Sequence, residues 1–297
     1  MMTLIRSDSS SQIGLGHIMR DLVLAESLDG EVLFACQDLQ GNIISSIPYE
    51  VKILKTNDAD ELIVLIQSLH VNLLVIDHYG IDAQFEQKVK IATGVKIFSF
   101  DDMYKPHHCD ILLNHNISAN KERYKGLVPE SCELHCGTLY TLIRDEFKKE
   151  KKLIREKIYD VCIAMGGTDA TNITLSILRA LPQTLQVSVL TTTSNTHLQD
   201  LQNYSEDKPH IALHINSNEV AKLLHQSRFA IVTPSVMVHE VLYMEVPFIA
   251  IKVATNQDDM YQYLKEHGYL TSDSLCIDTL LEHITLFREK NNEVNRY

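Results

Sequence analysis

The feature that most constrains this chain is a strand–helix alternation that runs along it twice. Short runs rich in Val, Ile and Leu alternate with amphipathic segments over residues 3–115 and again over 157–253. A charge run at 144–157, RDEFKKEKKLIREK, separates the two series and is typical of an exposed linker or a solvated helix. Because strands that alternate with helices form parallel sheets, the sequence predicts an α/β fold with two Rossmann-like domains, 1–145 and 146–297.

The alternation assigns most of the chain to regular elements. The expected strands are 3–8, 31–37, 72–80, 95–102, 109–115, 157–165, 185–192, 210–215, 228–233 and 247–253. The expected helices are 16–28, 58–70, 81–92, 169–181, 217–226 and 235–244. In such sheets, ligands bind beyond the carboxyl ends of the strands, so the loops at those ends are where functional residues are expected.

Composition limits the classes of partner. The net charge is −12 and no basic tract is present, which excludes nucleic acid and a stable membrane association as the main interactions. The six cysteines lie mostly in or beside apolar runs, as buried free thiols do. The chain starts without a signal-type apolar core, and no apolar run approaches ~18 residues. We therefore expect a cytoplasmic protein that acts on a small molecule.

The first loop between a strand and a helix carries the most chemistry. It reads RSDSSSQIGLGHIMR, in which Gly14 and Gly16 allow a tight turn and close approach of a ligand. His17 follows at the start of the expected helix, where the dipole disfavours an imidazolium. A neutral imidazole is what a general base needs, so we expect His17 to be one. The alternative is a histidine that hydrogen-bonds its own turn. Because the motif is G-x-G-H and not G-x-G-x-x-G, no dinucleotide cofactor is expected.

A second such loop, MGGTDATN at 165–172, suits a phosphate. Gly166 and Gly167 let backbone amides approach an anion, Thr168 adds a hydroxyl, and the following helix adds its positive end. The loop lacks the Lys of G-x-x-x-x-G-K-[ST], which excludes a kinase-type P-loop. We expect a diphosphate here, and the alternative is a plain turn.

Two later strand ends carry groups that suit a sugar nucleotide. Ser235 opens an expected helix in TPSVMVHE, and the carboxylate of Glu240 within it can accept hydrogen bonds from both hydroxyls of a ribose. Asn256 and Gln257 follow the strand IAIKV, where their amides suit sugar hydroxyls or phosphate oxygens. A surface glutamate and an ordinary helix N-cap are the respective alternatives.

The first half holds further polar clusters. The strand end VIDHYG places Asp77, His78 and Tyr79 where they could line a ligand site or cap a turn. Two other groups contain metal-ligand residue types: Asp101, Asp102, His107, His108 and Cys109, and then Cys132, His135 and Cys136. Neither spacing matches a known metal motif, so no metal site is expected.

Taken together, these stretches resemble a known family. RSDSSSQIGLGHIMRD, IDHYG, the region from FDDMYKPHHCDILLN to LIRDEF, MGGTD and the NQ segment are similar to the UDP-sugar hydrolase of pseudaminic acid biosynthesis. The resemblance covers nearly the whole chain. It implies release of UDP and 2,4-diacetamido-2,4,6-trideoxy-L-altrose, in a pathway that serves flagellin glycosylation. His17 matches the catalytic base of that family, and Tyr79 and Asn256 match positions near the sugar and the diphosphate. The C-terminal stretch SDSLCIDTLLEHITLFREK carries no motif, and it is either a final helix packed back on the cleft or a local extension.

The second half also resembles the nucleotide-binding half of the undecaprenyl-linked N-acetylglucosaminyltransferase of peptidoglycan synthesis. Gly167 and Thr168 match its diphosphate turn, and Glu240 matches its ribose ligand. Arg144 matches a basic residue near the phosphates, and Ile215 falls where backbone contacts to uracil are expected. Both families imply a GT-B fold, in which two Rossmann-like domains face a central cleft and the C-terminal domain binds UDP.

The expected reaction is hydrolysis at the anomeric carbon with inversion. A water activated by His17 attacks C1, and amides near Gly166 stabilise the departing diphosphate, so neither a metal nor a cofactor is required. A GT-B glycosyltransferase is the alternative enzyme, and it would need an acceptor site. In a nucleotide-sugar binding module that is not an enzyme, His17 would have no function. An oxidoreductase would need the complete dinucleotide motif.

Overall fold

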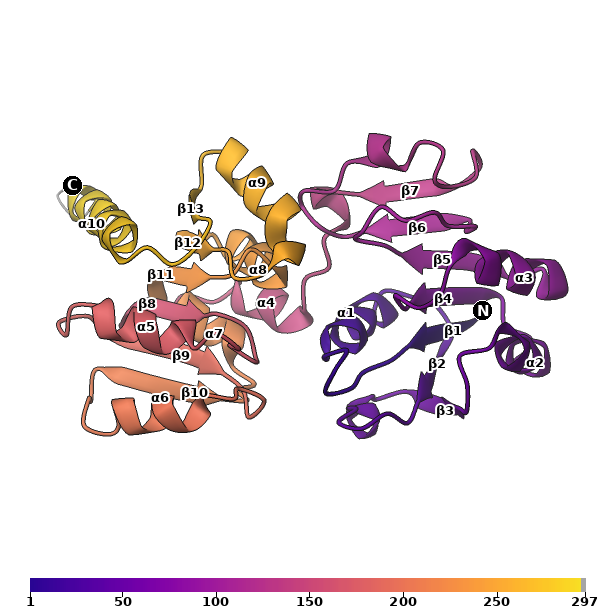
Figure 1. Ribbon diagram of the computed structural model, residues 1–297, viewed down its shortest axis with the longest axis horizontal. Coiled ribbons are helices and arrows are strands. Elements are labelled where there is room, and N and C mark those ends of the chain that lie inside the picture. Colours follow the sequence, from indigo (N-terminus) through magenta and orange to yellow (C-terminus); the bar gives the residue numbers. More distant parts are fainter. Residues whose placement is uncertain (295–297) are drawn as a thin grey trace. The chain divides into compact units, whose positions relative to one another are not determined.

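The computed structural model describes residues 1–294 and divides into two units, Met1–Leu142 and Ile143–Tyr297. The boundary lies shortly before the predicted one. Each unit consists of one parallel β-sheet with helices on both faces (Figure 1).

The first unit contains seven strands and three α-helices among its described elements. The strands are β1 (Met2–Ser7), β2 (Glu31–Gln37), β3 (Glu50–Leu54), β4 (Leu73–Asp77), β5 (Lys96–Phe100), β6 (Ile111–Asn114) and β7 (Glu133–Cys136). The helices are α1 (Gly16–Ala25), α2 (Ala59–Leu69) and α3 (Ala83–Thr93), with 3₁₀ turns η1 (Ile44–Ser46), η2 (Lys121–Tyr124) and η3 (Thr138–Tyr140). The strand order is β3-β2-β1-β4-β5-β6-β7, and all neighbours are parallel.

Continuous apolar strands build a core on each face of this sheet. Leu4 and Leu74 point to one face, where they pack with the helices α2 and α3. The next residues along these strands, Ile5 and Val75, point to the other face and pack against Ile18 of α1. Because both faces are covered, the strands show no polar alternation, as the sequence predicted for a parallel sheet.

The second unit repeats the architecture with six strands. These are β8 (Tyr159–Ala164), β9 (Val187–Thr191), β10 (Ile211–Ile215), β11 (Ser227–Val232), β12 (Phe248–Ile251) and β13 (Leu270–Ser272), in the parallel order β10-β9-β8-β11-β12-β13. The described helices are α4 (Asp145–Glu150), α5 (Ile173–Ala180), α6 (Leu198–Ser205), α7 (Val220–His225), α8 (Val236–Tyr243), α9 (Asp258–Glu266) and α10 (Ile277–Val294), with the turn η4 (Thr255–Gln257).

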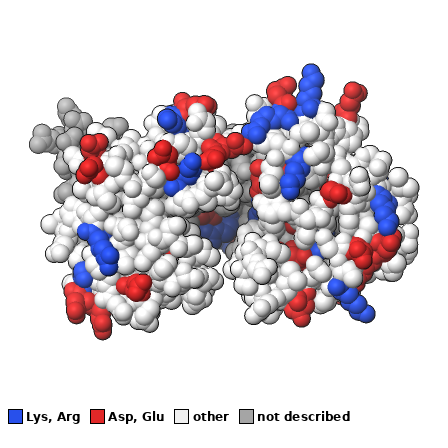
Figure 2. Space-filling view, viewed as in Figure 1, with Lys and Arg blue, Asp and Glu red and all other residues white. Residues whose placement is uncertain are grey.

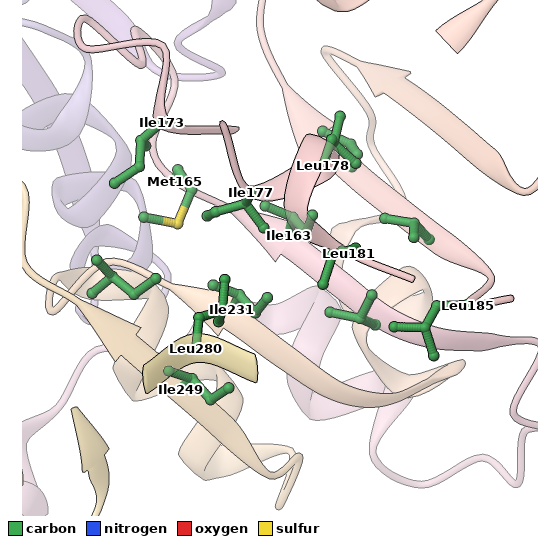
Figure 3. Packing of buried hydrophobic residues seen from close by; sticks show 14 of the residues in the cluster. Ile163, Met165, Ile173, Ile177, Leu178, Leu181, Leu185, Ile231, Ile249 and Leu280 are labelled. Atoms are coloured by element: carbon green, nitrogen blue, oxygen red, sulfur yellow. The ribbon is translucent and has the colours of Figure 1, made fainter. Parts of the chain in front are cut away.

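One core of this unit explains the final helix. Figure 3 shows Ile177 of α5 and Leu280 of α10 packed with Ile163 and Ile231 from neighbouring strands. Ile284 of α10 is also buried in this cluster. The motif-free C-terminal stretch is therefore a helix that closes the core of its own unit.

Some expectations about elements need correction. The charge run at 144–157 is not fully solvated, because it begins with α4 and Phe147 in that helix is completely buried. The helix expected at 16–28 ends at Ala25. The strands β3, β7 and β13 and the helix α6 were not predicted, because short strands and a mostly polar helix give weak hydrophobic patterns.

The strand order locates the ligand edge of each sheet. In the first unit the chain adds β2 and β3 on one side of β1 and then β4 to β7 on the other. In the second unit it adds β9 and β10 on one side of β8 and then β11 to β13 on the other. Loops at the carboxyl ends of these strand pairs diverge and leave a crevice for ligands. The stretches around His17, Tyr79, Gly166 and Ser235 all follow one of these four strands.

Charged side chains are mixed on the visible surface of each unit. In Figure 2, Lys and Arg are interspersed with Asp and Glu on the face shown. Among residues 1–294, no helix is long and apolar enough to cross a membrane.

Candidate functional site

The loop after β1 is built by its serines and glycines. Gly14 has φ +85° and exchanges backbone hydrogen bonds with Ser10, at 2.8 and 3.3 Å. The Ser10 hydroxyl accepts from the backbone N–H of Ile13 at 2.9 Å. Gly16 begins α1 and lies in open space, with no atom within 4 Å of the position a Cβ would take. The loop therefore delivers His17 as the second residue of α1.

His17 is buried and held by ring packing. Its side chain is 7% exposed, and its ring lies edge-on to Tyr79 with centroids 4.6 Å apart. Neither imidazole nitrogen forms a hydrogen bond within the described part of the chain. Burial is the main cause that lowers the pKa of His17, and the carboxylates of Asp77 and Asp102 oppose it. His17 is thus neutral near pH 7 and retains a free lone pair.

The neighbouring His78 has a different role. It accepts a hydrogen bond from Gly80 N–H at Nδ1, 3.0 Å, and its Nε2 lies 3.2 Å from Asp8 Oδ2. Asp8 is itself fixed by two hydrogen bonds from Arg6, at 2.6 and 2.8 Å. A Cβ on Gly80 would lie 2.9 Å from the His78 ring, so a larger residue here would displace that ring. His78 therefore uses both ring nitrogens within the protein and fixes the turn that carries Tyr79.

Acidic residues and one arginine surround Tyr79. The Tyr79 hydroxyl donates to Asp102 Oδ2 at 2.9 Å. Arg20, one turn after His17, donates two hydrogen bonds of 2.5 Å to Asp77 and one of 3.2 Å to Asp102. The strand ends of β1, β4 and β5 thus meet around His17. The sequence reasoning named Tyr79 but missed Arg20, although its spacing of three residues from His17 placed both on one helix face.

The residues that resembled a metal site bond to one another. His107 Nδ1 lies 2.8 Å from Glu86 Oε1, and its Nε2 lies 3.6 Å from Asp101 Oδ1. The Tyr124 hydroxyl donates to Asp101 at 2.7 Å. Among the residues searched, no group of three His, Cys, Asp or Glu side chains could hold a metal ion. In the second candidate group, Cys132 Sγ contacts the thiol of Cys109 at 3.7 Å.

In the second unit, the Gly166–Gly167 turn exposes backbone donors. Gly166 has φ +94°, and both glycines and Thr168 are exposed. Within the described chain, none of their three backbone N–H groups donates to a protein acceptor. Thr192 lies against the turn and donates to the Gly167 carbonyl at 2.8 Å. The turn therefore presents donors that an anion could accept.

The helix expected from residue 169 begins later and is already capped. It starts at Ile173, and Asp169 accepts hydrogen bonds from the N–H groups of Ile173 and Thr174 at 2.9 and 3.1 Å. The positive end of α5 is thus occupied by a buried carboxylate of the chain itself. The expected contribution of this helix dipole to phosphate binding is wrong.

A pocket of this unit joins the glycine turn to the ends of β9 and β10. Its lining residues are Arg144, Ala164, Gly166, Gly167, Leu190, Thr191, Thr192, His214, Asn216, Ser217, Val220 and Met237. Ile215 lies elsewhere, in a depression formed with α6, because adjacent residues of β10 point to opposite faces. The predicted uracil contacts involve the Ile215 backbone and stay a prediction; the sequence reasoning did not name His214 or Asn216, which line the pocket.

Arg144 and Glu240 form an ion pair. Arg144 donates to both carboxylate oxygens of Glu240, at 2.6 and 3.0 Å, and also pairs with Glu146 at 2.6 Å. The Glu240 side chain is 4% exposed, and burial raises its pKa although Arg144 opposes this. Arg144, not Glu240, lines the pocket.

The remaining predicted residues lie on two turns. Ser235 precedes α8, and its hydroxyl lies 2.9 Å from that of Thr233. Asn256 and Gln257 lie in η4, where the Gln257 side chain accepts from Val253 N–H at 2.9 Å. Asn256 is exposed, whereas Gln257 fixes the turn.

The comparisons with known proteins identify the family. No family model matches the chain. It is 48% identical, over 269 residues, to the UDP-2,4-diacetamido-2,4,6-trideoxy-β-L-altropyranose hydrolase of Campylobacter jejuni subsp. jejuni serotype O:2. The alignment covers 91% of this chain and 98% of that protein. This chain belongs to that hydrolase family.

Solved structures support the fold of this hydrolase family member. Acinetobacter baumannii MurG superposes with a TM-score of 0.60 at 13% identity, over 97% of this chain and 90% of that one. Anabaena Alr3699/HepE, solved in complex with UDP and glucose, gives 0.63 at 11% identity, over 98% and 91%. With two parallel-sheet units, these likenesses confirm the predicted GT-B class.

Proposed function

We propose that this chain hydrolyses UDP-2,4-diacetamido-2,4,6-trideoxy-β-L-altropyranose to UDP and the free sugar, in pseudaminic acid biosynthesis. The observation that carries this proposal is the 48% identity to the Campylobacter hydrolase over 98% of that protein's length. The likeness to glycosyltransferase structures is below 25% identity and concerns the fold alone, so it does not favour a transferase.

His17 is the proposed general base. Its buried, neutral imidazole accepts a proton from a water molecule. The water oxygen forms a bond to C1 on the face opposite UDP while the bond from C1 to the β-phosphate oxygen breaks. The bonding electrons leave with UDP, C1 is inverted, and His17 later returns its proton to solvent. UDP is a good leaving group, so one base suffices without a paired general acid.

The second unit is proposed to bind the nucleotide. The exposed amides of Gly166, Gly167 and Thr168 are suited to the diphosphate, because preorganised donors of this kind each contribute about 3 kcal/mol to a developing negative charge. Arg144 lines the adjacent pocket and is proposed to contact the phosphates. Glu240 retains a second lone pair on each oxygen for the ribose hydroxyls.

The other predicted residues complete the assignment. Tyr79, which packs on the base, and the exposed amide of Asn256 are proposed to contact the sugar or the diphosphate. Gly14 and Gly16 leave room for the sugar, whereas Ser235 and Gln257 shape the nucleotide side. We propose that the first unit, Met1–Leu142, supplies the base and that the second unit, Ile143–Tyr297, supplies the UDP contacts, Arg144 included. The cytoplasmic location remains a prediction.

An NMR time course tests the function. Purified protein with UDP-2,4-diacetamido-2,4,6-trideoxy-β-L-altropyranose and excess EDTA should release UDP and sugar of inverted anomeric configuration at the rate seen without EDTA. His17→Ala should lower that rate by roughly 10²- to 10⁴-fold, the usual contribution of a general base.

His108→Ala is the matched control, because His108 belongs to the same unit but lies outside the His17 cluster, and it should keep the wild-type rate. No UDP release by the wild type would refute the substrate. Release that survives His17→Ala would refute the base, and loss in EDTA that Mg²⁺ restores would refute the metal-independent reaction.

A further inference from the structure

Asp102 is a partly buried carboxylate that has no role in the proposed reaction. Its side chain is 19% exposed and lies in the loop after β5. Oδ2 accepts both the Tyr79 hydroxyl, at 2.9 Å, and Arg20 Nη1, at 3.2 Å. Tyr79 in turn packs on His17. Asp102 Oδ2 therefore links Arg20 of α1 to Tyr79, the residue that packs on His17.

Arg20 makes this link rigid. Its guanidinium clamps Asp77 with two hydrogen bonds of 2.5 Å and lies 5.1 Å from the centroid of Phe100. The His115 ring lies 3.5 Å from its Nη1. The Arg20 guanidinium is thus fixed by groups of β4, of β5 and of the residue that follows β6.

We propose that Asp102 is a positioning residue for His17: it fixes the Tyr79 ring against the imidazole and supplies the negative charge that favours the protonated imidazole during turnover. The inference rests on the proposed function, in which His17 accepts a proton from water. It assigns Asp102 a task that neither the metal-like sequence pattern nor the resemblance gave it.

The charges around the imidazole explain why Asp102 matters. From α1, Arg20 faces His17 as a cation, and Asp21 is completely buried, which raises its pKa and keeps it neutral. From the end of β4 come Asp77, the pKa of which is lowered because Arg20 outweighs its burial, and His78, which is paired with Asp8.

The positive charge of Arg20 is therefore neutralised by Asp77, and the carboxylate of Asp102 leaves one net negative charge beside His17. Lys105, with Nζ 5.8 Å from the Tyr79 ring centroid, is the next cation on the outer side. Because two carboxylates face one guanidinium, proton transfer to His17 restores local neutrality. Removing the charge of Asp102 should make the imidazolium less stable.

Two readouts separate charge from geometry. In Asp102→Asn, the pKa of His17, followed by NMR titration of labelled imidazole in the free protein, should fall by roughly half a pH unit or more. The acidic limb of kcat/KM should move to lower pH by the same amount, and kcat should fall about 10- to 100-fold. Tyr79→Phe should lower kcat and leave the pKa of His17 in place, because the Asp102 charge remains.

Asp60→Asn is the matched control, since Asp60 is an exposed carboxylate of the same unit that pairs with Lys88 on the surface. It should change neither readout. An unchanged pKa of His17 in Asp102→Asn would overturn the charge part, and full kcat in Tyr79→Phe would overturn the positioning part. Tyr79 is half exposed, so its variant tests the idea even if Asp102→Asn does not fold. The titration needs no substrate, so absence of UDP release by the wild type would refute the proposed function and not this inference.

Discussion

At the residue scale, neighbouring side chains of one type differ in chemistry because their partners differ. His78 uses both nitrogens within the protein, whereas His17 uses neither. The sequence favoured His17 because it follows two glycines at a helix start, but it could not show how His78 is used. What separates them is the Asp8 carboxylate, which reaches His78 from another strand.

The pairing of Glu240 with Arg144 gives a prediction at this scale. Glu240→Gln should weaken UDP binding by about 10- to 100-fold, because a hydrogen bond to a charged group contributes about 1.5–3 kcal/mol. The dissociation constant of 2′-deoxy-UDP should change less, since that ligand lacks one hydroxyl for the carboxylate. Isothermal titration calorimetry measures both.

The matched control is Glu146→Gln, which removes the other carboxylate partner of Arg144. It should leave the preference for UDP over 2′-deoxy-UDP unchanged. Equal weakening of both ligands by Glu240→Gln would show that Glu240 acts only through Arg144.

At the element scale, buried polar contacts decide how loops leave the sheets. Asp169 ends the glycine turn and starts α5 by capping two amides. In the first unit, Glu86 of α3 accepts from Ser99 of β5 at 2.6 Å and pairs with His107. These contacts fix the loop 101–110, which the sequence patterns showed only as a set of ligand-type residues.

His107 makes the stability of this region depend on pH. Burial alone would lower its pKa, but the nearby Asp101 carboxylate and the contact with Glu86 outweigh it and raise the pKa to about 9. The stabilisation is complete below the unfolded value of about 6.5 and is lost as pH rises through 9. The free energy of unfolding should therefore fall by up to roughly 3 kcal/mol across that interval.

Urea unfolding of wild type and His107→Gln between pH 6 and 10 measures this effect. The variant should be less stable at pH 6 and should lose the part of the pH dependence that belongs to His107. Parallel curves for the two proteins across this range would contradict the assignment.

At the scale of the whole molecule, each unit has its own sheet, cores and candidate site. The pocket beside the glycine turn is lined only by residues of the second unit, and the His17 cluster lies wholly in the first. The sequence predicted this division from the repeated alternation, because periodicity is a local property of each segment.

The separation of the two candidate sites predicts which backbone amides are protected when UDP binds without the sugar. In hydrogen–deuterium exchange, UDP at about 100 times its dissociation constant should protect amides near 165–168, 191–192 and 214–217, with a stabilisation of about 2.7 kcal/mol for that unit. Amides of the first unit should be unaffected. Protection confined to residues 8–20 and 77–80 would contradict the assignment of UDP to the second unit.

The sequence by itself determined the fold class, both strand–helix series and the loops that carry Gly14, His17, Tyr79 and the glycine pair, because these follow from local patterns of apolar residues and glycines. It could not determine which polar residues meet. Arg20 with Asp77 and Asp102, Arg144 with Glu240, and His107 with Glu86 join segments that are separated in the chain. Those contacts depend on strand order, helix packing and side-chain direction, which exist only once the sheets have formed and their helices have packed.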